Sequence, residues 1–81
     1  MEKEEVLDRV RQVVSDVLGV PTDDITAESE FVADLGAESI QSLELVAAFE
    51  EEFDIEMEEE AALQVQSVGD AVEFISRYLK A

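Results

Sequence analysis

Residues 34–53 read DLGAESIQSLELVAAFEEEF, and this stretch is the most informative part of the chain. It places Ser39 between an apolar turn and the start of a run that is patterned as an amphipathic helix. The stretch contains no lysine, arginine, histidine or cysteine. A serine that attacks a substrate needs a base nearby, usually histidine or lysine. Ser39 is therefore a poor candidate for a nucleophile and a good candidate for modification by another enzyme.

Two apolar faces run along residues 39–53 when they are placed on a helix at about 100° per residue. One face predicts a core stripe, which consists of Leu45, Val46, Phe49 and Phe53. The other face lies roughly 110–130° away by the same geometry. It consists of Ile40, Leu43 and Ala47, with Glu44, Glu50 and Glu51 at its borders. Either the preceding loop covers this second face, or it is an exposed patch ringed by carboxylates that suits a partner's groove.

A helix is also predicted before this stretch, over about residues 2–18. Its apolar residues recur at helical spacing: Val6, Leu7, Val10, Val13, Val14, Val17 and Leu18. Gly19 supplies a C-terminal stop, and Pro21 prevents continuation. The connection over residues 19–38 is long for so small a domain. Because it carries Ile25, Phe31, Val32 and Leu35, we expect it to pack against the helices.

Two more helical segments are predicted toward the C-terminus. A short helix or turn spans about residues 58–65, and Ser67 then caps a last helix, with Asp70 completing a variant capping box. The inward stripe of that helix consists of Val68, Ala71, Val72, Ile75, Tyr78 and Leu79. Strand alternation and internal repeats are lacking. The sequence therefore predicts one all-α domain over residues 1–81, a four-helix bundle with a long first loop and a short third helix.

The charge is extreme and unevenly placed. Twenty-two acidic residues face five basic ones, which gives a net charge of -17. The bases lie near the two ends: Lys3, Arg9, Arg11, Arg77 and Lys80. Binding to nucleic acid or to an anionic membrane depends on clustered bases, so both are disfavoured. A protein partner with a basic surface is the natural complement, although the acids could serve solubility alone, above all Glu2, Glu4 and Glu5.

The sequence also lacks the features that disulfides, metal sites, secretion and membrane insertion require. There is no cysteine, hence no disulfide framework or cysteine-based metal site. No EF-hand spacing occurs, so no metal site is expected. The acidic start is unlike a signal peptide, and no segment is apolar enough to span a bilayer. We expect a cytoplasmic monomer.

Residues 31–45, FVADLGAESIQSLEL, resemble the attachment segment of acyl carrier proteins. The usual pattern of that family is Asp-Leu-Gly-x-Asp-Ser-Leu, followed by a helix with a Glu-Leu pair and an acidic tail that ends in Phe. The resemblance covers about residues 6–79. It implies a carrier, not an enzyme, with 4′-phosphopantetheine from coenzyme A attached to Ser39. Acyl groups would then be held as thioesters for fatty-acid or polyketide-like synthesis.

The resemblance also implies a pocket, because in this family the acyl chain slips between the helices into the core. The matching positions are Phe31, Val32, Leu45, Val46, Phe49, Phe53, Met57, Ala62, Val65 and Ala71. Phe49 stands where the family more often has leucine. Its bulkier ring could shorten or reshape the cavity, since an added ring must displace something in a close-packed interior.

In the family, the helix beside the modified serine docks on basic enzymes, namely phosphopantetheinyl transferases, acyltransferases and synthases. The resemblance therefore favours the exposed-patch interpretation of the second face. The predicted docking residues are Glu38, Ile40, Leu43, Glu44, Ala47, Glu50 and Glu51. Two of them depart from the pattern, because Glu38 replaces aspartate and Ile40 replaces leucine. Both border the site that a transferase must recognise, so a specialised rather than general carrier is indicated.

Three alternatives stay open at this point. Ser39 could simply cap the helix, as serines at helix starts very often do, although a helix N-terminus also suits a phosphodiester. The cargo could be aminoacyl or peptidyl. Lastly, the chain could be an unmodified acidic helical domain that binds a partner or cations.

Overall fold

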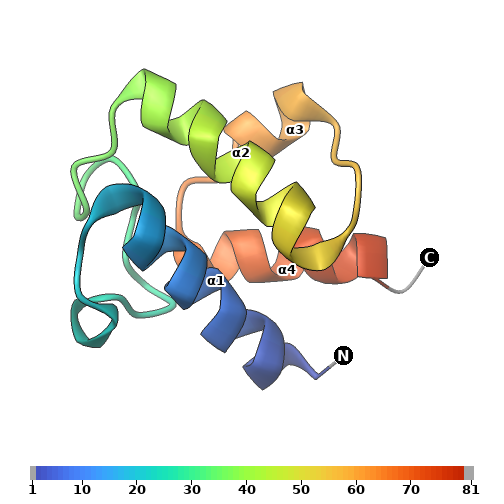
Figure 1. The fold of residues 1–81 in the computed structure, drawn as a ribbon, viewed down its shortest axis with the longest axis horizontal. Helices are drawn as coiled ribbons and strands as arrows, with labels where there is room; N and C mark the ends of the chain where they lie inside the picture. Colours follow the sequence, from blue (N-terminus) through green and yellow to red (C-terminus); the bar gives the residue numbers. More distant parts are fainter. Residues whose placement is uncertain (1, 80–81) are drawn as a thin grey trace.

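The structure is a computed structural model, and it describes residues 2–79. Its elements are α1 (Lys3–Leu18), the 3-10 turn η1 (Thr22–Asp24), α2 (Ser39–Phe53), α3 (Glu59–Leu63) and α4 (Val68–Leu79). Within the described residues, strand-like pairing is limited to an isolated bridge between Glu30 and Ser67. The all-α prediction, with a long first loop and a short third helix, is confirmed (Figure 1).

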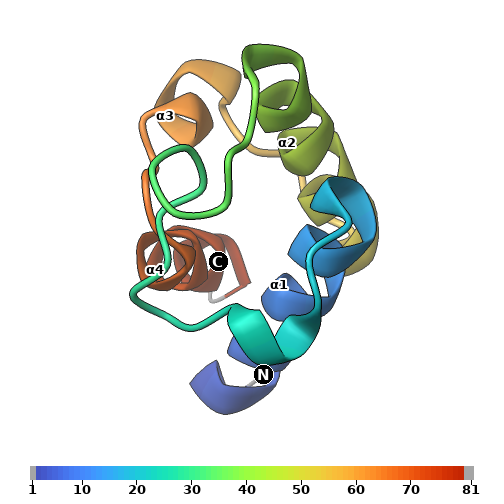
Figure 2. The ribbon, with the colours of Figure 1, turned by 90° about the vertical axis from the view of Figure 1, so that its left-hand side faces the viewer.

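The core is formed where α1 packs against both α2 and α4 (Figures 1 and 2). Each of these helices buries the apolar stripe that its sequence period predicts. The buried members on the three helices are Val6, Val10, Val13 and Val14, then Leu45, Phe49 and Phe53, then Val68, Ala71, Val72 and Ile75. The short helix α3 packs against α2. Figure 2 shows the long loop crossing one end of the molecule, from the end of α1 to the start of α2.

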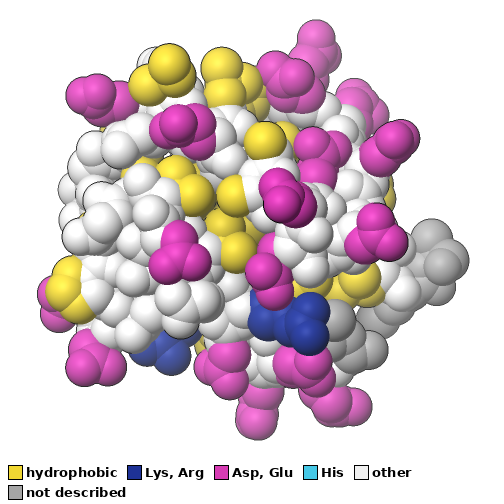
Figure 3. Space-filling view, viewed as in Figure 1, with side chains coloured by type: hydrophobic (Ala, Val, Ile, Leu, Met, Phe, Trp, Pro, Cys, Tyr) yellow, Lys and Arg dark blue, Asp and Glu magenta, His cyan; other side chains and the backbone are white. Residues whose placement is uncertain are grey.

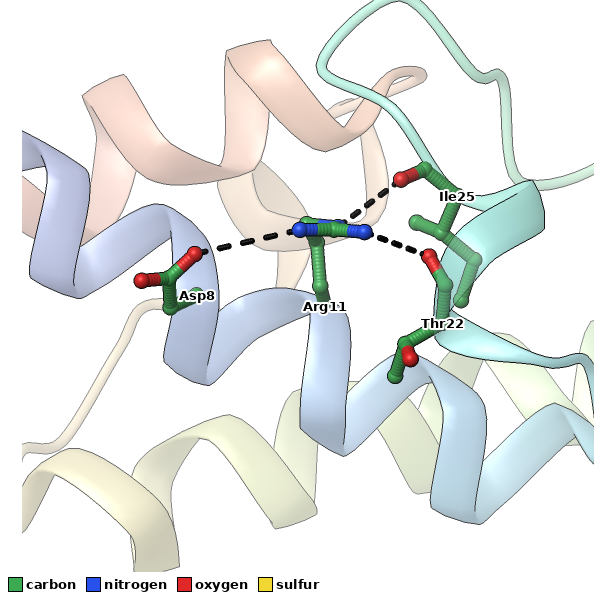
Figure 4. A network of polar contacts seen from close by, with 4 residues as sticks. All are labelled: Asp8, Arg11, Thr22 and Ile25. Atoms are coloured by element: carbon green, nitrogen blue, oxygen red, sulfur yellow. Dashed lines mark hydrogen bonds and ion pairs between the residues drawn. The ribbon is translucent and has the colours of Figure 1, made fainter.

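Arg11 of α1 holds the first part of the long loop (Figure 4). Its Nε donates to the carbonyl of Ile25 at 2.8 Å and its Nη2 to the carbonyl of Thr22 at 2.6 Å. On the other side, Nη1 lies 3.8 Å from a carboxylate oxygen of Asp8. These bonds give the Ile25 carbonyl a donor and the Thr22 carbonyl a second one, because Thr22 also accepts the Ile25 N–H at 3.1 Å. The side chain of Ile25 is completely buried.

The second part of the loop is bonded to the connection between α3 and α4. Backbone N–H groups join the two segments in three places: Phe31 to the Gln66 carbonyl at 2.9 Å, Val68 to Ser29 at 2.9 Å, and Gly69 to Ala27 at 2.7 Å. The last contact explains why residue 69 is a glycine. A Cβ built there would lie 2.9 Å from the Ala27 carbonyl oxygen.

The expectation that the loop packs down is confirmed for Ile25, Phe31 and Leu35 and is wrong for Val32. Ile25 and Phe31 are buried and Leu35 is half-buried, whereas Val32 is 67% exposed. The difference arises because residues 31–35 form a tight turn, in which Asp34 and Leu35 both donate their N–H groups to the Glu30 carbonyl at 3.0 Å. Phe31 points inward at the start of this turn, and the next side chain is left outside.

The helix ends mostly follow the predicted signals. Gly19 ends α1 in the left-handed conformation, with φ of 71°, and its N–H donates to the Ser15 carbonyl. Ser67 caps α4 as predicted, because its Oγ accepts the Asp70 N–H at 3.1 Å. The start of α3 is held from α4, where the hydroxyl of Tyr78 accepts the N–H of Glu58 at 3.1 Å.

Among residues 2–79, two basic side chains of α1 pair with acids on neighbouring helices. Lys3 lies 2.6 Å from Glu73 of α4, and Arg9 lies 3.7 Å from Glu52 of α2. Among the residues that the structure describes, the other carboxylates of α2 and α3 have no basic partner. Figure 3 shows them around the upper face of the molecule, with apolar side chains between them and the basic groups only lower down.

Candidate functional site

Ser39 is the first residue of α2, and its side chain is exposed. The residue before it, Glu38, occupies the N-cap position and forms a capping box with Gln41. The Glu38 N–H donates to Oε1 of Gln41 at 2.9 Å. The alternative that Ser39 caps the helix is therefore wrong. Within residues 2–79 no group hydrogen-bonds to its hydroxyl, which leaves that oxygen accessible to an incoming enzyme.

The turn before Ser39 is held firmly by local hydrogen bonds. Gly36 takes the left-handed conformation, with φ of 70°, which favours glycine at that position. Oδ2 of Asp34 accepts the N–H of Glu30 at 2.8 Å, and Ala37 donates its N–H to the Phe31 carbonyl at 2.8 Å. Ala37 is buried, so the chain is anchored two residues before the exposed serine. The Asp-Leu-Gly-Ala segment thus presents Ser39 outward.

A cavity of about 410 Å³ lies beside α2. Nine of the ten residues predicted to line an acyl pocket are found in its wall. They are Leu45, Val46 and Phe49 from α2, Phe31, Val32 and Met57 from the loops, and Ala62, Val65 and Ala71 from the C-terminal half. Phe53 is the exception, because it is buried in the core but is not part of the wall. The volume falls in the range of about 300–1,000 Å³ that small-molecule pockets occupy.

Seven further residues line this cavity and were not predicted. They are Glu30, Ala33, Ser42, Leu63, Gln66, Phe74 and Ile75. Two could have been found from the sequence. Ser42 lies three and four residues before Leu45 and Val46, on the same side of α2, and Ile75 belongs to the predicted inward stripe of α4. Phe74 lies on α4 outside its predicted inward stripe, and the others lie in the connections or at the end of α3.

The second apolar face of α2 is open to solvent. Ile40 is 66% exposed and Leu43 is 45% exposed, and Ala47 is exposed as well. The alternative that the long loop covers this face is therefore wrong. Two other large apolar side chains, Val32 and Leu63, are exposed where they line the cavity.

The acidic border of this face is not uniform. Glu38, Glu44 and Glu51 are exposed. Glu50 differs, because it is half-buried and its Oε2 accepts the N–H of Met57 at 2.8 Å. That bond spans the connection between α2 and α3, so Glu50 has a structural role and is less available to a partner than its neighbours.

Residues 2–79 lack two other kinds of feature. That part of the chain has no cluster of three or more acidic side chains arranged to hold a metal ion. Nor does it include a helix with the length and apolar character needed to cross a membrane.

Comparison with known proteins identifies the family. The pattern of a phosphopantetheine attachment site matches residues 8–75. The acyl carrier protein of Phenylobacterium zucineum is 49% identical over 77 residues, which are 95% of this chain and 98% of that protein. The chain belongs to the acyl carrier protein family. The acyl carrier protein of Caulobacter vibrioides is also 49% identical, over 72 residues that are 89% of this chain and 92% of that protein.

The fold agrees with this assignment. A candidate acyl carrier protein from Mycobacterium tuberculosis superposes with a TM-score of 0.82 and 26% identity, over 90% of this chain and 97% of that one. Acyl carrier proteins are carriers rather than enzymes, and their cofactor is covalently attached 4′-phosphopantetheine. The predicted family and cofactor are thereby confirmed, and the alternative of an unmodified acidic domain is set aside. Membership also implies contacts with synthases, acyltransferases and phosphopantetheinyl transferase.

The residues present fit that cofactor. The hydroxyl of Ser39 is exposed and free of hydrogen bonds within the described chain. The first N–H groups of α2 have no partner inside the helix and favour negative charge. Ser42, one turn further along α2, already lines the cavity. A group attached at Ser39 would therefore begin one helical turn from a residue of the cavity wall.

Proposed function

We propose that Ser39 carries the 4′-phosphopantetheine, and that this carrier holds acyl chains for fatty-acid or polyketide-like synthesis. The observation that supports this most directly is the exposed Ser39 hydroxyl at the start of α2, one turn from a largely apolar cavity of about 410 Å³. The cofactor supplies a thiol on which acyl groups are held as thioesters. The chain has no cysteine of its own to do so.

The local geometry favours a phosphodiester at Ser39 despite the net charge of -17. Ser39 is the first residue of a helix of 15 residues, whose N-terminus carries the positive end of the helix dipole. No basic side chain is needed for this interaction, because backbone N–H groups supply the hydrogen-bond donors. The role of Ser39 is to accept a group from another enzyme.

The cavity favours an acyl cargo over an aminoacyl one. Its wall is built mainly of aliphatic and aromatic side chains from α2, α4 and the loops. A hydrocarbon tail placed there would gain roughly 0.8 kcal/mol per buried methylene. An aminoacyl group would have to bury an ammonium ion among those side chains, which is costly unless the charge is paired. An acyl chain is therefore the better match.

Docking on enzymes is assigned to the exposed face of Ile40, Leu43 and Ala47, together with the carboxylates of Glu38, Glu44 and Glu51. A partner with a basic rim would satisfy the carboxylates while its apolar groove covers the centre. Glu50 contributes less, because its carboxylate is bonded to the Met57 backbone. Such docking suits a monomeric cytoplasmic carrier.

We further propose that this carrier is specialised. Glu38 uses its longer side chain in the capping box of α2, directly before the modified serine. Ile40 is 66% exposed directly after it, so its branched side chain belongs to the surface that a transferase must fit. A transferase matched to aspartate and leucine would meet a different shape at both positions.

Intact mass spectrometry tests the attachment. The purified chain is incubated with coenzyme A and a broad-specificity phosphopantetheinyl transferase, and its mass should rise by one phosphopantetheine. Ser39→Ala should abolish the gain, whereas Ser42→Ala, the matched change one turn later, should keep it. A mass gain that persists in Ser39→Ala would disprove the assignment.

A further inference from the structure

A second cavity adjoins the first, between α3 and α4, and it has a volume of about 350 Å³. Its wall differs in character, because it includes the polar side chains of Gln64, Asp70 and Arg77, all of which are exposed. Of the residues that line the two cavities, only Val65 and Phe74 belong to both walls. These two side chains therefore form the partition between the apolar cavity and the outer, polar one.

Phe74 supplies most of this partition, since its ring is much larger than the side chain of Val65. The ring is half-buried and lies edge-to-face against Tyr78, with 5.2 Å between the centroids and 61° between the planes. Tyr78 in turn accepts the Glu58 N–H at the start of α3. A phenyl ring makes no hydrogen bond of this kind, so Phe74 is held in place by packing alone.

The two cavities differ in polarity, and this difference determines how much an acyl chain gains by extending past the Phe74 ring. An acyl chain that starts at Ser39 and enters beside Ser42 would run along the α2 wall, which includes Leu45, Val46 and Phe49, toward α4. Each methylene buried there changes the sequestration equilibrium by about fourfold. Beyond Phe74 the walls are polar and open to water, so further methylenes gain little.

We propose that Phe74 is the residue that sets the longest acyl chain that this carrier can enclose. This inference rests on the proposed function, because it requires cargo to be attached at Ser39. It differs from the expectation drawn from the sequence, which pointed to Phe49. Phe49 is 5% exposed and lies in the side wall formed by α2. It lines the first cavity and not the second. Phe74 is the ring that closes the end.

The test uses the full chain, loaded with straight-chain acyl groups of increasing length from the corresponding acyl-coenzyme A thioesters. Two quantities are measured for each length: the rate at which hydroxylamine cleaves the thioester, and the thermal midpoint. In wild type, protection and midpoint should rise with each added carbon and then level off at a limiting length.

Substitutions of Phe74 should move this limit in opposite directions. Phe74→Ala should shift it to longer chains, with protection gaining about fourfold for each methylene newly enclosed, and Phe74→Trp should shift it to shorter chains. Phe74→Leu keeps more of the packing, so it should shift the limit to longer chains by a smaller amount than Phe74→Ala. It replaces the alanine variant in the test if that variant fails to fold. Phe53→Leu is the matched control, because that phenyl ring is buried but lines neither cavity.

The possible failures are distinguishable. If no acyl group is loaded at Ser39, the proposed function itself is wrong. If loading succeeds but the limit is the same in Phe74→Leu, Phe74→Trp and wild type, the inference is overturned, and a shift in Phe49→Leu alone would assign the limit to that ring instead. The inference is also overturned if thioester protection in the wild-type chain does not depend on acyl length.

Discussion

Replacing Arg11 by methionine should destabilise the domain by removing the clamp on the long loop. The guanidinium donates to the carbonyls of Ile25 and Thr22 at 2.8 and 2.6 Å. A hydrogen bond to a charged group contributes about 1.5–3 kcal/mol, and the Thr22 carbonyl would keep the Ile25 N–H as a donor after Arg11 is replaced. The Arg11 side chain is 29% exposed, so water can replace part of each bond. We therefore expect a loss of about 2 kcal/mol, because methionine keeps the apolar stem.

The assay is urea unfolding followed by far-ultraviolet circular dichroism, which should give a lower midpoint with an unchanged slope. For a domain of this size, the expected loss corresponds to a fall of about 10 °C in the thermal midpoint. Arg77→Met is the matched control, because it removes the same charge at an exposed position with no ion pair among the described residues. Asp8→Ala should cost less than about 0.5 kcal/mol, since Asp8 is 75% exposed and 3.8 Å away.

Equal losses in Arg11→Met and Arg77→Met would refute this reasoning. They would show that the net charge, and not the two bonds to the loop, accounts for the effect. If only Arg11→Met is destabilised, the loop that supplies Phe31 and Val32 to the cavity wall is held from α1.

Three further predictions concern docking, charge and the core. Leu43→Asp should weaken binding to a phosphopantetheinyl transferase by placing a charge in a desolvated contact, and Glu44→Lys or Glu51→Lys should slow association and reduce its salt dependence. Binding affinity and association rate are measured for each variant, with helicity checked by circular dichroism. The docking assignment is contradicted if Leu43→Asp unfolds the domain while the lysine variants bind as wild type does. The thermal midpoint should rise with salt or millimolar divalent cations, because the Debye length falls from about 30 Å at 0.01 M to about 3 Å at 1 M; an insensitive midpoint would show that the carboxylates are too far apart to repel. Ser76→Ala should stabilise the domain by about 1 kcal/mol, since the buried Ser76 hydroxyl has no partner among the described groups, and a loss of stability in urea unfolding would contradict this.

Much of the site was accessible from the sequence because it depends on helical periodicity. The stripe of α2 that contains Leu45 and Phe49 repeats at three and four residues, so the side of the helix that faces the cavity could be assigned without coordinates. The start of α2 was also marked, by the glycine turn and the polar residues around Ser39. These features are local, and a few neighbouring residues determine them.

Other features required the tertiary structure, because they depend on how distant segments meet. Val32 is exposed since the loop turns back on itself after Phe31, and Glu50 points inward since the chain after α2 brings the Met57 N–H to it. The partition at Phe74 depends on Val65, which follows α3 in the chain and lines the same two cavities as Phe74 of α4. By itself the sequence determined which residues form helices and which face each helix buries, because both follow from contacts within a few turns. Only the tertiary structure decided where the cavity ends, because that boundary lies between segments whose relative position no local pattern encodes.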